Sequence, residues 1–371
     1  MPSAFSYETI SAYGQKGSIM LFSSEQVSNG HPDKICDQIS DAIVTDILQH
    51  DKMGRIAAES MIKDYEITVM GEVTTNYEPD YDALIRGVLT KIGLPDVDKY
   101  NVRYLISKQS PDIAMGVDHD GAGDQGMMFG YATNETKELL PIPYVLSTKA
   151  LLKLREYNLA NHFEKLRPDA KAQVSFDYDA HRIDTFLIST QHAEEISLDE
   201  VREIVSKIMK ETAEEAGLND DFRILVNPTG RFVLGSSFAD SGLTGRKIIA
   251  DTYGGAAHHG GGAFSGKDPS KVDRSAAYMA RKIARDIVLS GQADRCEVQL
   301  AYAIGVAEPV SVYVDCFGTE KKNRTEIWEE IKDNYDLTPK GIIKSLGLRD
   351  VDYNLVSSYG HFGKPELPWE K

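Results

Sequence analysis

The order in which helical and extended patterns recur along the chain constrains its fold more than any other feature of the sequence. The first unit predicts a helix in which Ile35, Ile39, Ile43 and Ile47 share one face. Two alternating runs, a second helix and a short strand follow, and the same order returns after about 120 residues, an ordinary domain length. The expected elements are helix 33–49, strands 55–62 and 65–73, helix 81–92 and strand 102–107; helix 145–157, strands 172–178 and 182–189, helix 197–217 and strand 222–226; helix 270–289, strands 296–302 and 310–316, and helix 324–334.

This repetition predicts the fold class. Alternation such as Val174–Phe176–Tyr178 is typical of antiparallel sheets with one apolar face. We predict an α+β fold of three similar domains with mainly antiparallel or mixed sheets, related by a pseudo-threefold internal repeat. The expected domains cover residues 20–118, 123–234 and 235–371, after a polar extension at 1–19. The repeat is visible in pattern and not in residue identity, so chance similarity among α+β segments stays an alternative.

Composition narrows the classes of partner and compartment. The 371 residues carry a formal net charge of −16, which argues against non-specific binding of nucleic acid. The chain has three cysteines and none in a CxxC pair, which fits a reducing cytoplasm, with small core residues as the plainer interpretation. Met20-Leu21-Phe22 is far too short for a signal peptide or a membrane span. We therefore expect a cytoplasmic protein without a membrane or nucleic-acid partner.

The stretch 260–275, GGGAFSGKDPSKVDRS, combines a glycine-rich turn with cations and carboxylates. Gly261 and the pair Gly266-Lys267 stand at GxxxxGK spacing, and glycines allow backbone N–H groups to approach phosphate oxygens. Pro269 suits the first position of a helix with Asp268 as its cap, which would create an anion-binding helix terminus. The P-loop pattern wants Ser or Thr at position 268, so the motif is incomplete. A surface loop before an amphipathic helix is the plainer interpretation.

A second candidate helix start occurs at 30–34, GHPDK. Pro32 suits a first helical turn, His31 can donate to a phosphate or a leaving oxygen, and Asp33 can hold magnesium together with phosphate oxygens. A simple capping cluster is the alternative, because an aspartate in a first turn complements the helix dipole.

Further candidates are spread over the chain. Glu59 and Glu72 lie on expected strands, where most glutamates face solvent. A buried carboxylate there would need a metal or an amino group. Phe232 offers a surface for stacking on a base, although a core position is its commoner fate. The run 240–247, DSGLTGRK, adds a second glycine turn with two cations. Together with Lys267 and Lys271 these cations carry more positive charge than one phosphate needs. This amount of positive charge suits a polyphosphate with magnesium. A solvated basic face is the alternative.

Three long stretches resemble the S-adenosylmethionine synthetases, or methionine adenosyltransferases. They are GHPDK at 30–34, GAGDQGMMFGYATNET at 121–136 and GGGAFSGKDPSKVDRSAAY at 260–278. The likeness runs from about Leu21 to Lys371. It implies three similar α+β domains, and homotetramers built as dimers of dimers with active sites shared between subunits. It also implies that the methionine sulfur attacks C5′ of ATP, and that the released triphosphate is then cleaved to phosphate and diphosphate.

The resemblance also implies a role for individual residues. The implied catalytic residues are His31, Lys171, Arg246, Lys247 and Lys267. The implied ATP-binding residues are His31, Asp169, Lys171, Arg231, Phe232, Asp240, Arg246, Lys247, Ala263 and Lys267. The implied methionine-binding residues are Glu72, Gln109, Asp240 and Lys271. Asp33 and Asp273 would hold two Mg²⁺ ions per site, and Glu59 would hold one K⁺ ion.

Two other functions are open from the residues alone. Another Mg-ATP-dependent transferase or an ATPase with a degenerate phosphate loop would favour Ser or Thr at position 268 and a parallel sheet. A non-catalytic nucleotide-binding regulator would be expected to have lost charged site residues.

One departure from the family concerns 114–120, where family members often carry a longer loop that closes the site.

Overall fold

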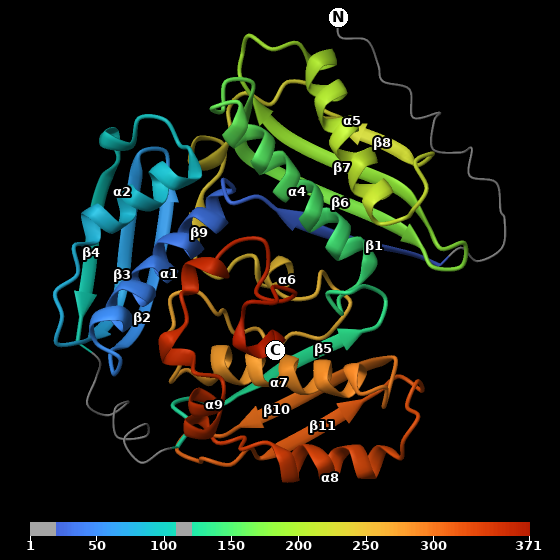
Figure 1. Ribbon diagram of the computed structural model, residues 1–371. Helices are drawn as coiled ribbons and strands as arrows, with labels where there is room; N and C mark the ends of the chain where they lie inside the picture. Colours follow the sequence, from blue (N-terminus) through green and yellow to red (C-terminus); the bar gives the residue numbers. More distant parts are fainter. Residues whose placement is uncertain (1–19, 109–120) are drawn as a thin grey trace, which may run out of the picture.

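A computed structural model describes residues 20–108 and 121–371, and contains three sheets with helices packed on them (Figure 1). The first sheet has the order β4-β3-β2-β9, with strands Asn101–Ser107, Glu66–Thr74, Arg55–Lys63 and Gly242–Leu243. Its helices are α1 (Pro32–His50) and α2 (Tyr81–Ile92). β2 and β3 are antiparallel, with Glu59 opposite Met70, and β3 and β4 are parallel.

The second sheet repeats this plan in the order β1-β6-β7-β8. Its strands are Leu21–Val27, Leu166–Asp177, Arg182–His192 and Arg223–Val226, and β7 and β8 are the parallel pair. Helices α4 (Ile142–Ala160) and α5 (Leu198–Glu215) belong to this unit.

The third sheet, β11-β10-β5, is antiparallel throughout and has three strands. They are Ser311–Asp315, Arg295–Tyr302 and Gly126–Thr133. α7 (Val272–Leu289) packs on β5 and β10, and α8 (Arg324–Asn334) packs on β11. Short helices α6 (Ile248–Asp251) and α9 (Pro339–Ser345) and 3-10 turns at 97–99, 236–238, 348–350, 353–355 and 368–370 complete the described chain.

The three sheets exchange their edge strands in a cycle. β1 comes from the first third of the chain and pairs with β6, β5 comes from the middle and pairs with β10, and β9 comes from the last third and pairs with β2. The predicted segments 20–118, 123–234 and 235–371 therefore each donate their first described strand to a sheet built mainly by another segment. The ends of these segments stay a prediction.

The predicted α+β class with mixed and antiparallel sheets is confirmed, and the expected helices and strands have their ends within three residues of the prediction, except that β6 begins six residues earlier, at Leu166. The exchanged strands β1, β5 and β9 were not predicted. Their pairing partners lie far away in sequence, so no local hairpin pattern marks them. Among the described residues, no helix is both long enough and apolar enough to cross a membrane.

One helix start differs from the expectation. α7 begins at Val272 with Lys271 as its N-cap, and not at Pro269 with Asp268 as the cap. The Asp268 carboxylate is buried and accepts the backbone N–H groups of Ile56 and Ser270, so it fixes the preceding turn against β2.

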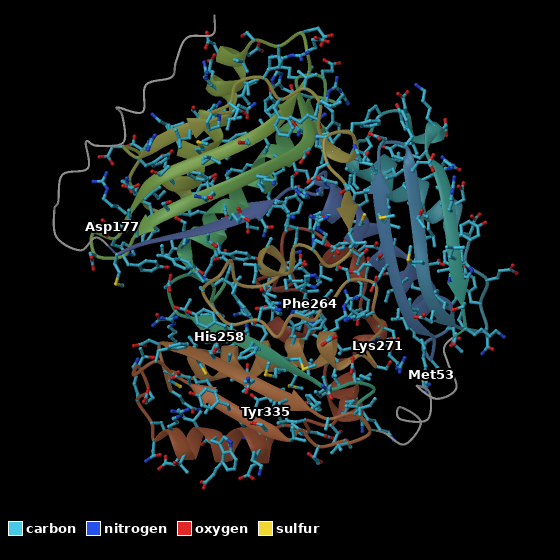
Figure 2. All side chains as sticks on the ribbon, turned by 180° about the vertical axis from the view of Figure 1, so that it is seen from behind. Met53, Asp177, His258, Phe264, Lys271 and Tyr335 are labelled. Atoms are coloured by element: carbon cyan, nitrogen blue, oxygen red, sulfur yellow. The ribbon has the colours of Figure 1, made fainter. Side chains whose placement is uncertain are left out.

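The hydrophobic core brings the site segments to the centre of the molecule. One continuous cluster joins the helices of the first and third units, and a second cluster fills the middle unit. Figure 2 shows Phe264 between the three sheets and Lys271 beside the first sheet. The glycine-rich turn before α7 therefore lies where the three units meet.

Candidate active site

Three buried carboxylates on one face of α1 hold the loops that form the site. Asp33, Asp37 and Asp41 are four residues apart, so they share a helix face. They accept backbone N–H groups at 2.9, 2.8 and 3.0 Å from, in this order, Leu243, Gly245 and Gly266. A single helix thereby fixes both glycine turns of the sequence.

Each carboxylate of this face also has a cationic partner. Lys247 Nζ lies 2.5 Å from Asp33, Lys34 lies 2.9 Å from Asp37, and Arg274 pairs with Asp41. Lys34 also bonds Asp251 of α6. Burial raises the pKa of Asp37 to about 7, although Lys34 opposes this by favouring the carboxylate. The face is thus a compensated ionic cluster, as buried charges require.

His31 is the N-cap of α1, and its hydrogen bond defines its tautomer. Its Nδ1 accepts the Asp33 N–H at 3.2 Å, so in the neutral ring Nε2 carries the proton. Burial lowers the pKa of His31 to about 3, and the positive charges of Lys247 and Lys171 act in the same direction. The imidazole is therefore neutral at physiological pH and offers one N–H donor.

Several predicted phosphate and nucleotide residues gather around His31. Lys171 on β6, Lys247 and Asp240 all act on the imidazole electrostatically, and Arg246 Nε lies 3.6 Å from Asp33. Asp169 is buried beside them, accepts the Ser236 N–H at 2.7 Å, and has its pKa raised by burial to about 6. The structure thus brings these predicted residues into one cluster.

The second glycine turn lies against the first. A Cβ built on Gly245 would lie 2.5 Å from Ala263 Cβ, so the two turns touch. Gly266 is held by Asp41 on one side, and its carbonyl accepts the Ala58 N–H of β2 at 2.9 Å. Lys267 follows directly and its Nζ lies 2.6 Å from Asp273.

A cavity of about 330 Å³ opens beside this turn, and four of the predicted residues line it. Lys267, Lys271 and Asp273 line it from the α7 side, and Glu72 lines it from β3. Lys271 also bonds the buried Asp268. The cavity therefore joins the residues expected at the triphosphate with two of those expected at methionine.

Four predicted residues lie outside these contacts. Arg231 is exposed and pairs with Glu194 at 2.5 Å, and the Phe232 N–H donates to His192 Nε2 at 3.0 Å. Glu59 lies exposed on the outer face of the first sheet. Gln109 and the loop 114–120 fall outside the described residues.

Sequence reasoning missed the supporting residues Asp37, Asp41, Arg274 and His259. The spacing of the three aspartates on α1 was a visible signal, since an acidic row at every fourth position forms a continuous helix face. Their burial was not visible, because it depends on loops that lie over 200 residues away.

The comparisons with known proteins agree with this geometry. Family models described as the N-terminal, central and C-terminal domains of S-adenosylmethionine synthetase match residues 19–111, 119–232 and 234–371. The chain belongs to the S-adenosylmethionine synthetase family. An S-adenosylmethionine synthase of Mesoplasma florum is 47% identical over 367 residues, covering 95% of this chain and 97% of that protein. Members of this family are generally metal-dependent.

Proposed function

We propose that the protein transfers the adenosyl group of ATP to the sulfur of L-methionine, and then hydrolyses the triphosphate to phosphate and diphosphate. The observation that carries this proposal is the convergence of His31, Lys171 and Lys247 with the Lys267 turn, through loops fixed by α1. Four separate parts of the chain contribute to this one basic site. Such a charge suits a triphosphate better than a single phosphate.

The first chemical step needs positioning and anion stabilisation. A thioether has no proton to lose, so the attack of sulfur on C5′ requires no general base. Negative charge develops on the oxygen that leaves C5′, and a preorganised donor there lowers the barrier most. The neutral His31 offers its Nε2–H for this purpose, because Nδ1 is already committed to the Asp33 N–H.

The other predicted residues bind the phosphate chain, methionine and the nucleotide. Lys171, Arg246, Lys247 and Lys267 bind the phosphate oxygens. Glu72 and Lys271, in the cavity beside Lys267, bind the charged groups of methionine together with Gln109 and Asp240. Asp169, Arg231 and Ala263 contact the nucleotide, and Phe232 stacks on adenine, with its backbone held by His192.

The carboxylates fit magnesium that is shared with a phosphate chain. Among the described residues no group of three or more His, Cys, Asp or Glu side chains forms a complete metal cage. Mg²⁺ commonly uses one or two carboxylates plus phosphate oxygens, so Asp33 and Asp273 suit two ions of this kind. The ions would neutralise the triphosphate charge. Glu59 alone supplies too few oxygens for K⁺, so substrate or another subunit would complete that site.

The outer face of the first sheet supports a shared site in an oligomer. Met61, Met70 and Leu105 are 46, 41 and 69% exposed there, beside Glu59 and Glu72. Exposed apolar side chains that gather on one sheet face are typical of an interface. We infer a homotetramer built as a dimer of dimers, with this face buried in the dimer. The three free cysteines support a reducing, cytoplasmic location.

The test is an assay of the purified protein with Mg-ATP and K⁺, with and without L-methionine. We expect a sulfonium product, phosphate and diphosphate, all dependent on methionine. Equal ATP consumption without methionine would contradict the proposal and favour the alternative, an ATPase or another Mg-ATP-dependent transferase.

A further inference from the structure

We propose that His259 is a positioning residue that holds the triple-glycine turn, Gly260 to Gly262, in the conformation that receives the phosphate chain. His259 Nδ1 accepts the Gly261 N–H at 2.8 Å. The inference rests on the proposed function for the identity of the ligand. The geometry itself concerns only residues of this chain.

The turn needs an external support because its own side chains supply none. Gly261 has a φ of +95°, which favours glycine, and glycines lose the most conformational freedom when they are fixed. The turn also touches its surroundings closely. A Cβ on Gly260 would lie 1.6 Å from Met127 O, and one on Gly262 would lie 2.3 Å from Asp273 Oδ1.

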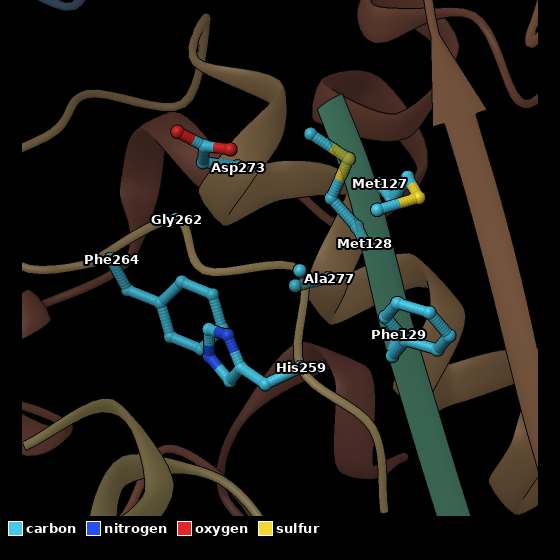
Figure 3. Close-up of a pocket in the computed structure, with 9 residues that line it drawn as sticks. Met127, Met128, Phe129, His259, Gly262, Phe264, Asp273 and Ala277 are labelled. Atoms are coloured by element: carbon cyan, nitrogen blue, oxygen red, sulfur yellow. The ribbon is translucent and has the colours of Figure 1, made fainter. Parts of the chain in front are cut away.

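The imidazole is itself held in place by an aromatic neighbour. Its ring stacks on Phe264, with the centroids 5.9 Å apart and the planes 29° apart. Figure 3 shows the two rings side by side, with Gly262 between Phe264 and Asp273. Phe264 follows the turn by two residues, so this ring contact connects the residue before the three glycines to a residue after them.

The segment that follows the turn has a separate support at Gly266. Asp41 of α1 accepts the Gly266 N–H, and Ala58 of β2 donates to the Gly266 carbonyl. His259 thus fixes Gly261 at one end while α1 and β2 fix Gly266 at the other. Ala263, which touches Gly245 of the other phosphate turn, lies between these two supports.

The protonation state of the ring agrees with this role. A neutral imidazole that accepts at Nδ1 carries its proton on Nε2, and burial lowers the pKa of His259. Among the described residues the buried Nε2 has no hydrogen-bond partner. Among the described residues the ring therefore makes one hydrogen bond, as the acceptor for the Gly261 N–H, and an amide oxygen can replace that acceptor.

Two substitutions separate the acceptor from the ring. His259→Asn places an oxygen at the Nδ1 position and removes the ring, whereas His259→Phe keeps a ring against Phe264 and removes the acceptor. His258→Asn is the matched control, because it makes the same exchange at the neighbouring residue, whose ring pairs with Glu297 at 2.7 Å and not with the glycine turn. Circular dichroism and thermal melting would establish that all three variants fold.

The first measurement is steady-state kinetics of sulfonium formation. We expect His259→Phe to lower kcat about ten- to a hundredfold, with KM for methionine changed less than about threefold, because a small displacement of positioned groups slows chemistry steeply. His259→Asn should stay within about threefold of the unmodified protein, and so should His258→Asn. Equal losses in His259→Asn and His259→Phe, or turnover of His259→Phe within twofold of normal, would overturn the inference.

The second measurement does not need turnover. Hydrogen exchange of peptides covering 260–266 should be several-fold faster in His259→Phe than in the unmodified protein or His259→Asn, because an amide that loses its acceptor opens more readily. Unchanged exchange in His259→Phe would overturn the inference. A protein without methionine-dependent activity but with this exchange pattern would refute the proposed function while leaving the role of His259 intact.

Discussion

Arg274 of α7 and Asp41 of α1 form a bidentate ion pair with N–O distances of 2.7 and 2.9 Å, and both side chains are fully buried. Asp41 also accepts the Gly266 N–H, so this pair ties the two helices to the turn that carries Lys267. The pair therefore links the stability of the core with the geometry of the site.

Breaking this pair should destabilise the protein strongly. Asp41→Asn leaves the Arg274 guanidinium buried without a counter-charge, which costs about 3–5 kcal/mol of the free energy of unfolding. Urea denaturation would measure the change. Lys153→Ala, which removes an exposed pair with Glu215, is the control and should cost less than about 1 kcal/mol. Similar losses of unfolding free energy in both variants would show that the buried pair contributes no more than an exposed one.

His31 should separate into a cap and a catalytic donor. His31→Asn keeps an acceptor at the Nδ1 position for the Asp33 N–H but loses the Nε2–H, so we expect kcat to fall about 10²–10³-fold with little loss of stability. His31→Ala should in addition lose about 0.5–2 kcal/mol of stability, because the α1 N-cap is removed. Kinetics and thermal melting on both variants would decide, and an active His31→Asn protein would exclude the donor role.

Asp169 should make stability depend on pH. Burial raises its pKa from 3.8 to about 6, so between these values the folded chain keeps a proton that the unfolded chain releases. This contribution is favourable at low pH and is lost as the pH rises through about 6, a change of about 3 kcal/mol. Asp169→Asn keeps an acceptor for Ser236 and removes the titration. Its free energy of unfolding relative to the unmodified protein should therefore rise between pH 4 and 7 in denaturant titrations, and parallel curves would refute this.

The close approach of Gly262 to Asp273 predicts a selective effect on metal activation. In Gly262→Ala the methyl group would lie 2.3 Å from Asp273 Oδ1, so the carboxylate or the turn must move. We expect the Mg²⁺ concentration for half-maximal activity to rise about tenfold or more, because misplaced ligands bind weakly. Gly87→Ala in α2 has open space around it and should preserve this constant while stabilising the helix by about 0.5–1 kcal/mol. An unchanged Mg²⁺ dependence in Gly262→Ala would argue against Asp273 as a ligand.

The exposed apolar face of the first sheet predicts the effect of a new charge. Met70→Lys places an ammonium group in the inferred interface, and we expect smaller particles in sedimentation together with loss of activity. Leu289→Lys, at the exposed end of α7, is the control and should leave both unchanged. A fully active monomeric Met70→Lys protein would refute the shared active site.

Local periodicity made most elements predictable from sequence. The row of isoleucines on α1 and the alternation in β6 each indicate which face is buried, because a helical or extended repeat is determined by neighbouring residues alone. β1, β5 and β9 pair across the units, and LFSSEQV or GMMFGYAT carries no local sign of a partner. Their places are set by tertiary packing alone.

The candidate site, too, was predictable only in part. The glycine and charge motifs pointed to His31, Asp33, Lys247 and Lys267, and the structure brings these residues to two adjoining turns. Their roles in phosphate binding stay a prediction. Asp268 looked like a helix cap and is instead an acceptor for β2. The supporting groups Asp41 and His259 carry no motif of their own, since their roles depend on which backbone N–H reaches them in the folded chain.

The cyclic exchange of β1, β5 and β9 has a consequence for synthesis on the ribosome. The edge of the first sheet cannot form until residues 242–243 have been made, and β1 cannot pair until β6 has been made. The earliest third of the chain therefore leaves the ribosome before its pairing partners exist. The exchange is therefore complete only after β10 (Arg295–Tyr302), the last of the pairing partners, has been made, and the three units should be gained or lost together rather than one by one.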